Sequence, residues 1–304
     1  MTATKQATKV AITGADGFTG AHLTRLLQKR GYVVHGLRRS IDGDESDDIH
    51  WHKCDLANPS AIAEVLDAVR PDRIVHLAAV SFVAYGDVEA MYRTNVIGTR
   101  NLLEAVARTN CPVRSLILAS SANIYGNRVG GILTEESPPE PANDYAVSKL
   151  AMEYVGRLYA ERLPIITVRP FNYTGVGQAE HFLIPKIVDH IRRRAPVIEL
   201  GNLDVERDFS DVRSVVAAYA GLLEEPAAIG RTLNICSGRS YSLRQVLDIT
   251  QALADHQIEV RVNPAFVRQK EVRTLSGSRA QLDVLLPSLP NPQLEETLQW
   301  MLSA

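Results

Sequence analysis

The chain has 304 residues, of which 45% are hydrophobic and 22% charged, and its formal net charge is -2. This length supports one large or two modest domains with a real core. The lack of a basic excess argues against nucleic acid and anionic membranes as partners. The three cysteines are scattered and lack metal-ligand spacing, which fits a reducing compartment, no metal site and no disulfide framework. Residues 1–9 lack an apolar signal core, and the longest apolar run, 215–223, is too short for a membrane span, so we expect a cytoplasmic protein.

The first clear signature is a short apolar run followed by a glycine-rich turn. Residues 9–13 show no alternation, which indicates a strand buried on both faces. Gly14, Gly17 and Gly20 follow, with Phe18 between them, and residues 21–27 have helical periodicity. Such a turn lets the backbone approach a pyrophosphate, to which the helix N-terminus offers N–H groups. A tight turn without a ligand is the alternative, but the strand–turn–helix context favours dinucleotide binding.

The end of the second predicted strand, residues 32–37, indicates which dinucleotide binds. NAD-binding versions of this turn usually have an acidic residue here, which takes the ribose 2′-hydroxyl. Arg38 and Arg39 occupy the place instead. Two guanidinium groups suit a 2′-phosphate, so we expect NADP(H), the alternative being two solvated surface arginines.

Further cofactor contacts are expected at the ends of strands predicted over residues 50–54 and 73–79. Asp55 is positioned to contact the adenine, or alternatively to cap a helix over 59–69. The small side chains of Ala78 and Ala79 let a cofactor lie close to the backbone. The predicted contacts here are Asp55, Leu56, Leu77, Ala78 and Ala79.

Two polar residues in this region are interpreted as structural. His76 has no partner at metal-ligand spacing, so we expect it in or near the core rather than on a metal. Asn95 lies in a long helix predicted over residues 91–108, and we expect it to form structural hydrogen bonds rather than to catalyse.

The strongest chemical signal combines a strand end with a helix start. A strand predicted over 113–119 leads into the segment 120–126, and a helix predicted over 143–161 carries Tyr145 and Lys149 four residues apart on one face. An ammonium beside a tyrosine favours the phenolate, and a serine hydroxyl at the same point can hold a carbonyl or alcohol oxygen. This is a proton-transfer device for interconverting C=O and CH–OH. A chance Tyr-x-x-x-Lys pattern in an ordinary helix is the alternative.

The order of elements predicts an α/β fold. Strands and helices alternate to about residue 170, which indicates a doubly wound parallel Rossmann sheet. We expect an NADP-binding domain over 1–170, to which 212–235 returns, and a smaller C-terminal α/β substrate lobe over 171–211 and 236–304. The later predicted helices are 184–194, 212–225 and 243–254, and the later predicted strands are 197–200, 232–235 and 258–262.

In this order the motifs resemble those of the extended short-chain dehydrogenase/reductase family, over essentially the whole chain. The matching segments are residues 13–20, 76–79, 120–121 and 125–126, the Tyr145-x-x-x-Lys149 pair, and residues 169–172 and 207–212. The resemblance implies a catalytic set of Ser121, Tyr145 and Lys149. It selects Ser121 because the family's serine lies four residues before the tyrosine of the Tyr-Gly pair. It also implies that Lys149 binds the nicotinamide ribose.

The later half resembles the GDP-sugar enzymes of this family. Residues 268–277 match their Arg-x-x-Glu-Val-x-x-Leu-x-Gly segment, although the usual proline after the arginine is absent. The match implies that Arg268 holds the diphosphate and that Glu271 accepts from ribose hydroxyls, with Arg207 as a second diphosphate clamp. The implied substrate contacts are Ser81, Ser121, Ala122, Asn123, Tyr145, Asn172, Arg207, Arg268 and Glu271.

Asn123 decides which reaction of these enzymes we expect. The 4,6-dehydratases have a glutamate at this position, and the GDP-fucose-type epimerase-reductases have a cysteine there and a histidine where Phe182 stands. An asparagine amide does not titrate usefully, so it replaces neither group. The resemblance therefore implies NADPH-dependent reduction of the 4-keto group of GDP-4-keto-6-deoxy-D-mannose, with GDP-D-rhamnose as the first product expected and 6-deoxy-D-talose left open.

Three alternatives remain: an NAD-dependent sugar-nucleotide 4-epimerase, a GDP-mannose 4,6-dehydratase and a cofactor-sensing regulator without catalysis. Members of the family often pair the two helices beside the active site across a two-fold axis, which implies a homodimer. The residues expected on that surface are Val96, Leu103, Val106, Tyr154 and Leu158, although they could instead pack only against the sheet.

Overall fold

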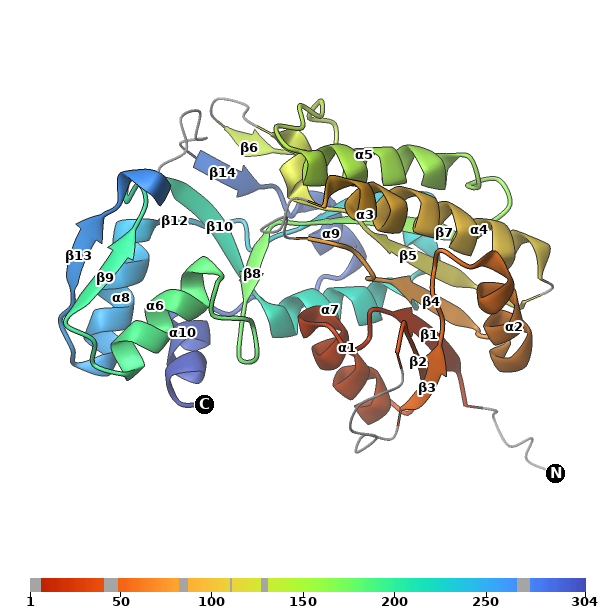
Figure 1. Cartoon of the computed structure of the whole chain (residues 1–304), viewed down its shortest axis with the longest axis horizontal. Coiled ribbons are helices and arrows are strands. Elements are labelled where there is room, and N and C mark those ends of the chain that lie inside the picture. Colours follow the sequence, from red (N-terminus) through yellow and green to blue (C-terminus); the bar gives the residue numbers. More distant parts are fainter. Residues whose placement is uncertain (1–6, 41–48, 82–86, 110, 127–130, 267–273) are drawn as a thin grey trace. The chain divides into compact units, whose positions relative to one another are not determined.

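The computed structural model describes residues 7–40, 49–81, 87–109, 111–126, 131–266 and 274–304, and Figure 1 shows its elements. The chain divides into two compact units. The first comprises residues 1–124, 141–169 and 216–233, and the second comprises residues 125–140, 170–215 and 234–304. Within the described ranges, no helix is long and apolar enough to cross a membrane.

The main sheet has seven strands among the described residues, in the order β11-β7-β5-β4-β1-β2-β3. All pairs formed among β1, β2, β3, β4, β5 and β7 are parallel, and the middle strands are buried almost throughout. Strands buried on both faces explain the continuous apolar runs, and the predicted fold class is confirmed. The strands are β1 (Lys9–Thr13), β2 (Val33–Arg38), β3 (His50–Lys53), β4 (Arg73–His76), β5 (Ser115–Ala119), β7 (Ile165–Pro170) and β11 (Thr232–Ile235).

Helices α2, α4 and α5 pack on one face of this sheet, and α1 and α7 lie on the other (Figure 1). Leu103 and Val106 of α4 belong to the core under the first face, with 0% and 3% exposure. The prediction that these two residues face a partner subunit is therefore wrong, because their side of the helix packs on the sheet. The helices are α1 (Phe18–Lys29), α2 (Pro59–Val69), α4 (Thr99–Arg108), α5 (Asp144–Arg157) and α7 (Val212–Leu222).

The helix predicted over 91–108 begins earlier and contains a π-helical segment. Asp87 caps its start, because Asp87 Oδ1 accepts from Ala90 N at 2.8 Å, and α3 (Val88–Tyr92) follows. The wider turns of η1 (Arg93–Gly98) lead from α3 into α4. Asn95 lies in this π-helical segment and is 1% exposed.

Helix α5 begins where Asn143 caps it, with Asn143 Oδ1 accepting from Ala146 N at 2.9 Å. It ends at Arg157, earlier than predicted. Glu153 of this helix is 2% exposed and accepts from Nε and Nη2 of Arg169 at 2.9 and 2.8 Å. This bidentate ion pair is buried within the first unit, one helical turn beyond Lys149.

The second unit contains a mixed sheet centred on β10. Strand β10 pairs antiparallel with β12 and parallel with β14 and β8, and β14 pairs with β6. Strands β9 and β13 form a separate parallel pair. The elements are β6 (Ile132–Leu133), β8 (Asn172–Thr174), α6 (Leu183–Arg192), β9 (Val197–Leu200), β10 (Glu206–Asp211), β12 (Ser240–Ser242), α8 (Leu243–Ala254), β13 (Glu259–Val262), β14 (Thr274–Gly277), α9 (Ala280–Leu285) and α10 (Leu294–Leu302).

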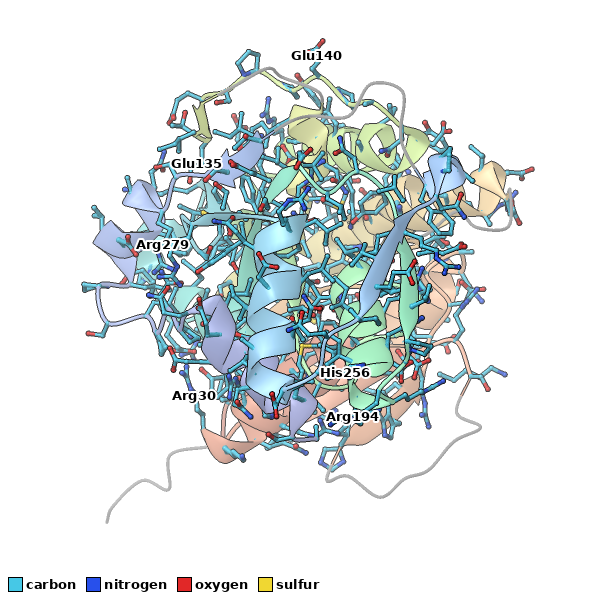
Figure 2. All side chains as sticks on the ribbon, turned by 90° about the vertical axis from the view of Figure 1, so that its left-hand side faces the viewer. Arg30, Glu135, Glu140, Arg194, His256 and Arg279 are labelled. Carbon is cyan, nitrogen blue, oxygen red and sulfur yellow. The ribbon has the colours of Figure 1, made fainter. Side chains whose placement is uncertain are left out.

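Helices α6, α8 and α10 form the apolar core of this unit together with β9. Figure 2 labels Arg194 and His256 near the ends of α6 and α8. Arg194 Nη2 donates to Asp255 O at 3.2 Å, and His256 Nε2 lies 3.0 Å from Ala195 O. These bonds tie the ends of the two helices together.

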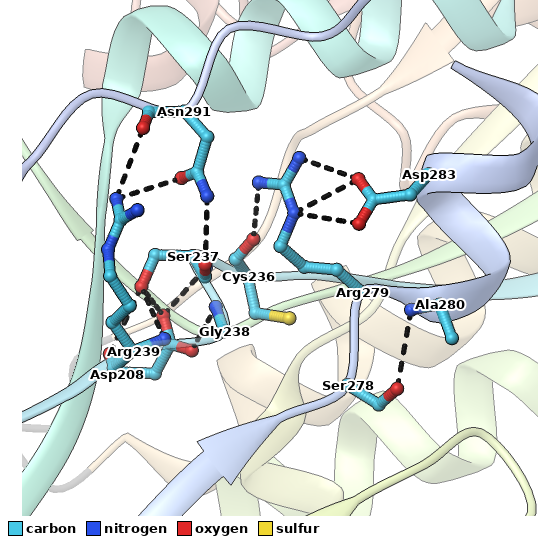
Figure 3. A network of polar contacts seen from close by, with 10 residues as sticks. All are labelled: Asp208, Cys236, Ser237, Gly238, Arg239, Ser278, Arg279, Ala280, Asp283 and Asn291. Carbon is cyan, nitrogen blue, oxygen red and sulfur yellow. Dashed lines mark hydrogen bonds and ion pairs between the residues drawn. The ribbon is translucent and has the colours of Figure 1, made fainter. Parts of the chain in front are cut away.

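Asp208 of β10 organises the loop after β11 (Figure 3). It is 0% exposed and accepts from the backbone N and Oγ of Ser237 and from Gly238 N, at 2.7–2.8 Å. Arg279 Nη1 donates to Cys236 O in the same loop, at 3.2 Å. Asp208 therefore fixes the backbone of this loop by hydrogen bonds. Arg207 is the preceding residue of the same strand, β10.

Breaking the Glu153–Arg169 pair should destabilise the protein strongly, because Glu153→Gln leaves a buried guanidinium without its counter-charge. We expect the free energy of unfolding to fall by about 3–5 kcal/mol. Glu89 forms an exposed ion pair with Arg93, so Glu89→Gln is the matched control and should change nothing measurable. Urea denaturation of both variants tests this, and equal stability of the two would refute the expected cost of burial.

Candidate active site

The glycine-rich turn between β1 and α1 has no room for side chains at two of its glycines. Gly14 has a φ of +69°, and a Cβ atom there would lie 2.9 Å from Ala78 N. A Cβ on Gly20 would lie 2.2 Å from Gly14 O. Gly17 caps α1, and Phe18 is its first residue. The backbone is thus bare at a helix N-terminus, which is the arrangement that a pyrophosphate needs.

The loop after β4 is held by buried hydrogen bonds that run through His76. Thr99 Oγ1 donates to Asn95 O at 2.7 Å, so it must accept from His76 Nε2, 2.8 Å away. His76 Nδ1 then accepts from Thr13 Oγ1 at 2.7 Å, and Thr13 Oγ1 accepts from Ala78 N at 3.1 Å. Burial lowers the pKa of His76 to about 3, which keeps the ring neutral. The core position predicted for His76 is confirmed.

The side chain of Asn95 connects this loop to the start of α5. Its Oδ1 accepts from Val80 N at 2.9 Å, and its Nδ2 donates to Val80 O and to Ser148 Oγ at 3.1 and 3.0 Å. Ser148 Oγ in turn donates to Tyr145 O at 2.8 Å. Asn95 is a structural hydrogen-bonder, as expected, and its bonds reach the backbone of Tyr145.

Lys149 is a buried cation next to Tyr145. It is 3% exposed, and its Nζ donates to Ala119 O at 2.7 Å and lies 5.9 Å from the centroid of the Tyr145 ring. Burial lowers the pKa of Lys149 to about 8, and the charge of Glu153 acts against this shift. The end of β5 and the first turns of α5 therefore meet around one ammonium group.

Ser121 and Asn123 belong to the short turn that follows β5. Ser121 is 7% exposed, and its Oγ accepts from Asn123 N at 3.1 Å, which leaves its hydroxyl proton available for another acceptor. Ala122 is buried, whereas Asn123 is exposed at the start of η2 (Ala122–Tyr125). Ser120 Oγ is buried and has no hydrogen-bond partner among the described residues.

Strand β2 ends in Arg38, whose guanidinium carbon lies 4.1 Å from the centroid of the Trp51 ring. Arg39 follows and is exposed. Asp55 Oδ1 accepts from Ala57 N at 2.9 Å in the loop after β3. The helix-cap alternative for Asp55 is wrong, because Asn58 Oδ1 accepts from Ser60 N and Ala61 N and caps α2.

The other predicted contacts lie at the following places. Leu56 is buried, Leu77 N donates to Thr13 O at 3.1 Å, Ala79 is half-buried, and Ser81 is exposed. In the second unit, Asn172 Nδ2 donates to Asp208 O at 3.3 Å, next to Arg207 on β10. Arg268 and Glu271 lie outside the described residues.

Several residues that support this arrangement have no role predicted from the sequence. Thr99 carries no motif, and Thr13 and Ser148 lie inside matching motifs without an assigned role, so only their contacts reveal what they do. Trp51 was assigned to a strand without a role. The glycine at position 36 was the available signal, because a glycine inside a strand often marks a close approach.

Comparisons with known proteins place the chain in a family. The family model described as GDP-mannose 4,6 dehydratase matches residues 11–301. A GDP-6-deoxy-D-talose 4-dehydrogenase of Aggregatibacter actinomycetemcomitans is 35% identical over 90% of each chain. A GDP-6-deoxy-D-mannose reductase of Pseudomonas aeruginosa is 31% identical, over 97% of this chain and 96% of the relative.

Two solved structures resemble the chain over its length. A Burkholderia cenocepacia protein, provisionally described as an epimerase, is 47% identical with a TM-score of 0.93 and covers 97% of both chains. RMD from P. aeruginosa in complex with NADPH is 29% identical with a TM-score of 0.83, over 98% of this chain and 97% of that one. The chain therefore belongs to the extended short-chain dehydrogenase/reductase family, among its NAD(P)-binding sugar-nucleotide enzymes.

Proposed function

We propose that the protein catalyses NADPH-dependent reduction of the 4-keto group of GDP-4-keto-6-deoxy-D-mannose. The observation that carries the proposal is Asn123, an exposed amide beside Ser121, at a position where water elimination, or epimerisation by proton transfer at carbon, needs a titrating side chain. Two relatives, named a GDP-6-deoxy-D-talose 4-dehydrogenase and a GDP-6-deoxy-D-mannose reductase, support the GDP-sugar substrate and the reacting carbon, C4.

The residues of the first unit fit a dinucleotide. The glycine turn leaves the backbone bare where the pyrophosphate would bind, and Arg38 and Arg39 suit a 2′-phosphate. Asp55, Leu56, Leu77, Ala78 and Ala79 complete the proposed contacts, and Lys149 would hold the nicotinamide ribose. When bound, NADPH supplies the hydride for C4. The relative solved with NADPH supports this choice of cofactor.

Side chains of the protein would supply the proton that the reduction requires. Tyr145 donates it to the alkoxide that develops at O4, and the Ser121 hydroxyl donates a hydrogen bond to the same oxygen. The Lys149 ammonium stabilises the phenolate that Tyr145 becomes. Ser121 suits this role because its oxygen already accepts from Asn123 N, so its proton points elsewhere.

The substrate would be held mainly by groups that match its charges and hydroxyls. Arg207 and Arg268 suit the diphosphate, Glu271 the nucleotide ribose hydroxyls and Asn172 a neutral polar group. Ser81, Ala122 and Asn123 complete the proposed set.

Reduction at C4 leads to one of two products. GDP-D-rhamnose is our first expectation, and the first relative named above makes GDP-6-deoxy-D-talose the second candidate. The dehydratase and epimerase alternatives are supported by the name of the family model and by the Burkholderia protein's provisional description. Asn123 weakens the dehydratase alternative, and the arginines at the end of β2 weaken the 4-epimerase alternative.

A product assay tests the proposal. The purified protein should consume GDP-4-keto-6-deoxymannose with NADPH, more efficiently than with NADH, and should leave GDP-mannose unchanged. NMR of the product gives the configuration at C4. Tyr145→Phe should abolish turnover yet bind NADPH. Release of GDP-4-keto-6-deoxymannose from GDP-mannose by the wild type would instead establish a dehydratase.

The pH dependence should report the charge of Lys149. Its pKa is lowered to about 8 by burial, so the ammonium is present below that pH and is lost as the pH rises through it. We expect kcat/KM for reduction to fall above about pH 8. Glu153→Gln removes the charge that opposes the shift, so the decline should begin at lower pH. A flat profile to pH 10 would contradict this role of Lys149.

We also propose a homodimer formed through η1 and α5. The exposed residues are apolar or aromatic, with 39–77% exposure, and they are Ile97 of η1, Val147 and Tyr154 of α5, and Leu158, which caps the C-terminal end of α5. The elements η1 and α5 contact each other. Leu158→Glu should shift the protein toward monomer in sedimentation equilibrium. Val284→Glu, at an equally exposed position on α9, should not. A monomeric wild type at micromolar concentration would remove the proposal.

A further inference from the structure

Strands β2 and β3 are paired so that Gly36 lies opposite Trp51. A Cβ atom on Gly36 would lie 2.5 Å from Trp51 Cζ3, so only glycine leaves space for the indole ring against the strand. Glycine weakens the interior of a strand, which makes its presence here informative. The sheet edge is built to admit this ring.

The face of the indole, rather than its N–H group, makes the specific contact. Trp51 Nε1 is buried without a hydrogen-bond partner among the described residues, which is an unfavourable place for a donor. The ring instead lies under the Arg38 guanidinium, with 4.1 Å between the guanidinium carbon and the ring centroid. Stacking of this kind is attractive and limits the positions that a guanidinium can take.

We propose that Trp51 is a positioning residue for cofactor choice: it holds Arg38 at the carboxyl end of β2, ready to receive the 2′-phosphate of NADPH. This inference rests on the proposed use of NADPH. Arg39 is exposed at the next position, whereas Arg38 is held by the Trp51 ring, so we expect Arg38 to contribute more to discrimination than Arg39 does. Because the stack already orders the Arg38 side chain, less conformational entropy is lost when the cofactor binds.

A purely structural role for the stack predicts something different. If Trp51 only packs against the edge of the sheet, its loss lowers the stability of the protein and reduces the affinity for all adenosine ligands by the same factor. If it positions Arg38, the loss acts on ligands that carry a 2′-phosphate. The decisive quantity is therefore a ratio of two affinities in one protein.

The experiment uses adenosine 2′,5′-bisphosphate and adenosine 5′-monophosphate, which differ only in the 2′-phosphate. Calorimetry gives the affinity ratio for the wild type, Trp51→Leu, Trp51→Phe and Arg38→Ala. We expect a wild-type ratio of about tenfold or more, a reduction of about three- to tenfold in Trp51→Leu, and recovery in Trp51→Phe, which keeps an aromatic face. In turnover assays, Trp51→Leu should raise the KM for NADPH. It should leave kcat with either cofactor, and the KM for NADH, unchanged.

Trp300→Leu is the matched control, because Trp300 stacks with Arg213 in the second unit at the same 4.1 Å. It should leave the affinity ratio unchanged. A wild type that does not prefer the bisphosphate overturns both the NADPH proposal and this inference. A wild type that prefers it, with the ratio retained in Trp51→Leu, overturns the inference alone.

Discussion

The first unit depends on keeping one ammonium group charged in a nearly dry interior. Lys149 has a carbonyl acceptor at Ala119 and the carboxylate of Glu153 one turn away, and burial still lowers its pKa to about 8. Its position also requires the end of β5 and the first turns of α5 to meet. An ammonium at this place is what a tyrosine needs when it releases a proton, so the fold and the proposed chemistry share one electrostatic constraint.

A second set of contacts fixes the geometry around that charge. Neutral His76 joins Thr13 at the glycine turn to Thr99, and Asn95 in the π-helical segment reaches both Val80 and Ser148. Every donor in this chain of bonds has an acceptor. A fully satisfied buried network makes the structure rigid, whereas an unpaired buried polar group would destabilise the fold. The same network therefore holds the proposed cofactor loop and the backbone of Tyr145.

Periodicity predicted the elements that are long or continuously apolar. The strand at 9–13 and the helix at 243–254 have the expected bounds, because burial on both faces and helical spacing leave clear patterns. Strand β10 was missed because four of its six residues are charged, and only pairing in space stabilises it. Leu103 was expected on a dimer surface, with packing against the sheet as the alternative, since periodicity gives the apolar face of a helix but not what covers it. Among the site residues, the catalytic set was predicted from motif spacing and stays a prediction. Trp51 could not be assigned a role from the sequence, because its role follows from the contact with Arg38.

The central claim is that hydride from NADPH reaches C4 and that nothing is eliminated. NADPH deuterated on both faces of the nicotinamide C4 tests it most directly. With GDP-4-keto-6-deoxymannose as substrate, NMR should show one deuterium at C4 of a GDP-6-deoxyhexose and none at C5 or C6. A product that carries no deuterium at C4, or carries it at another carbon, would contradict the proposed reaction.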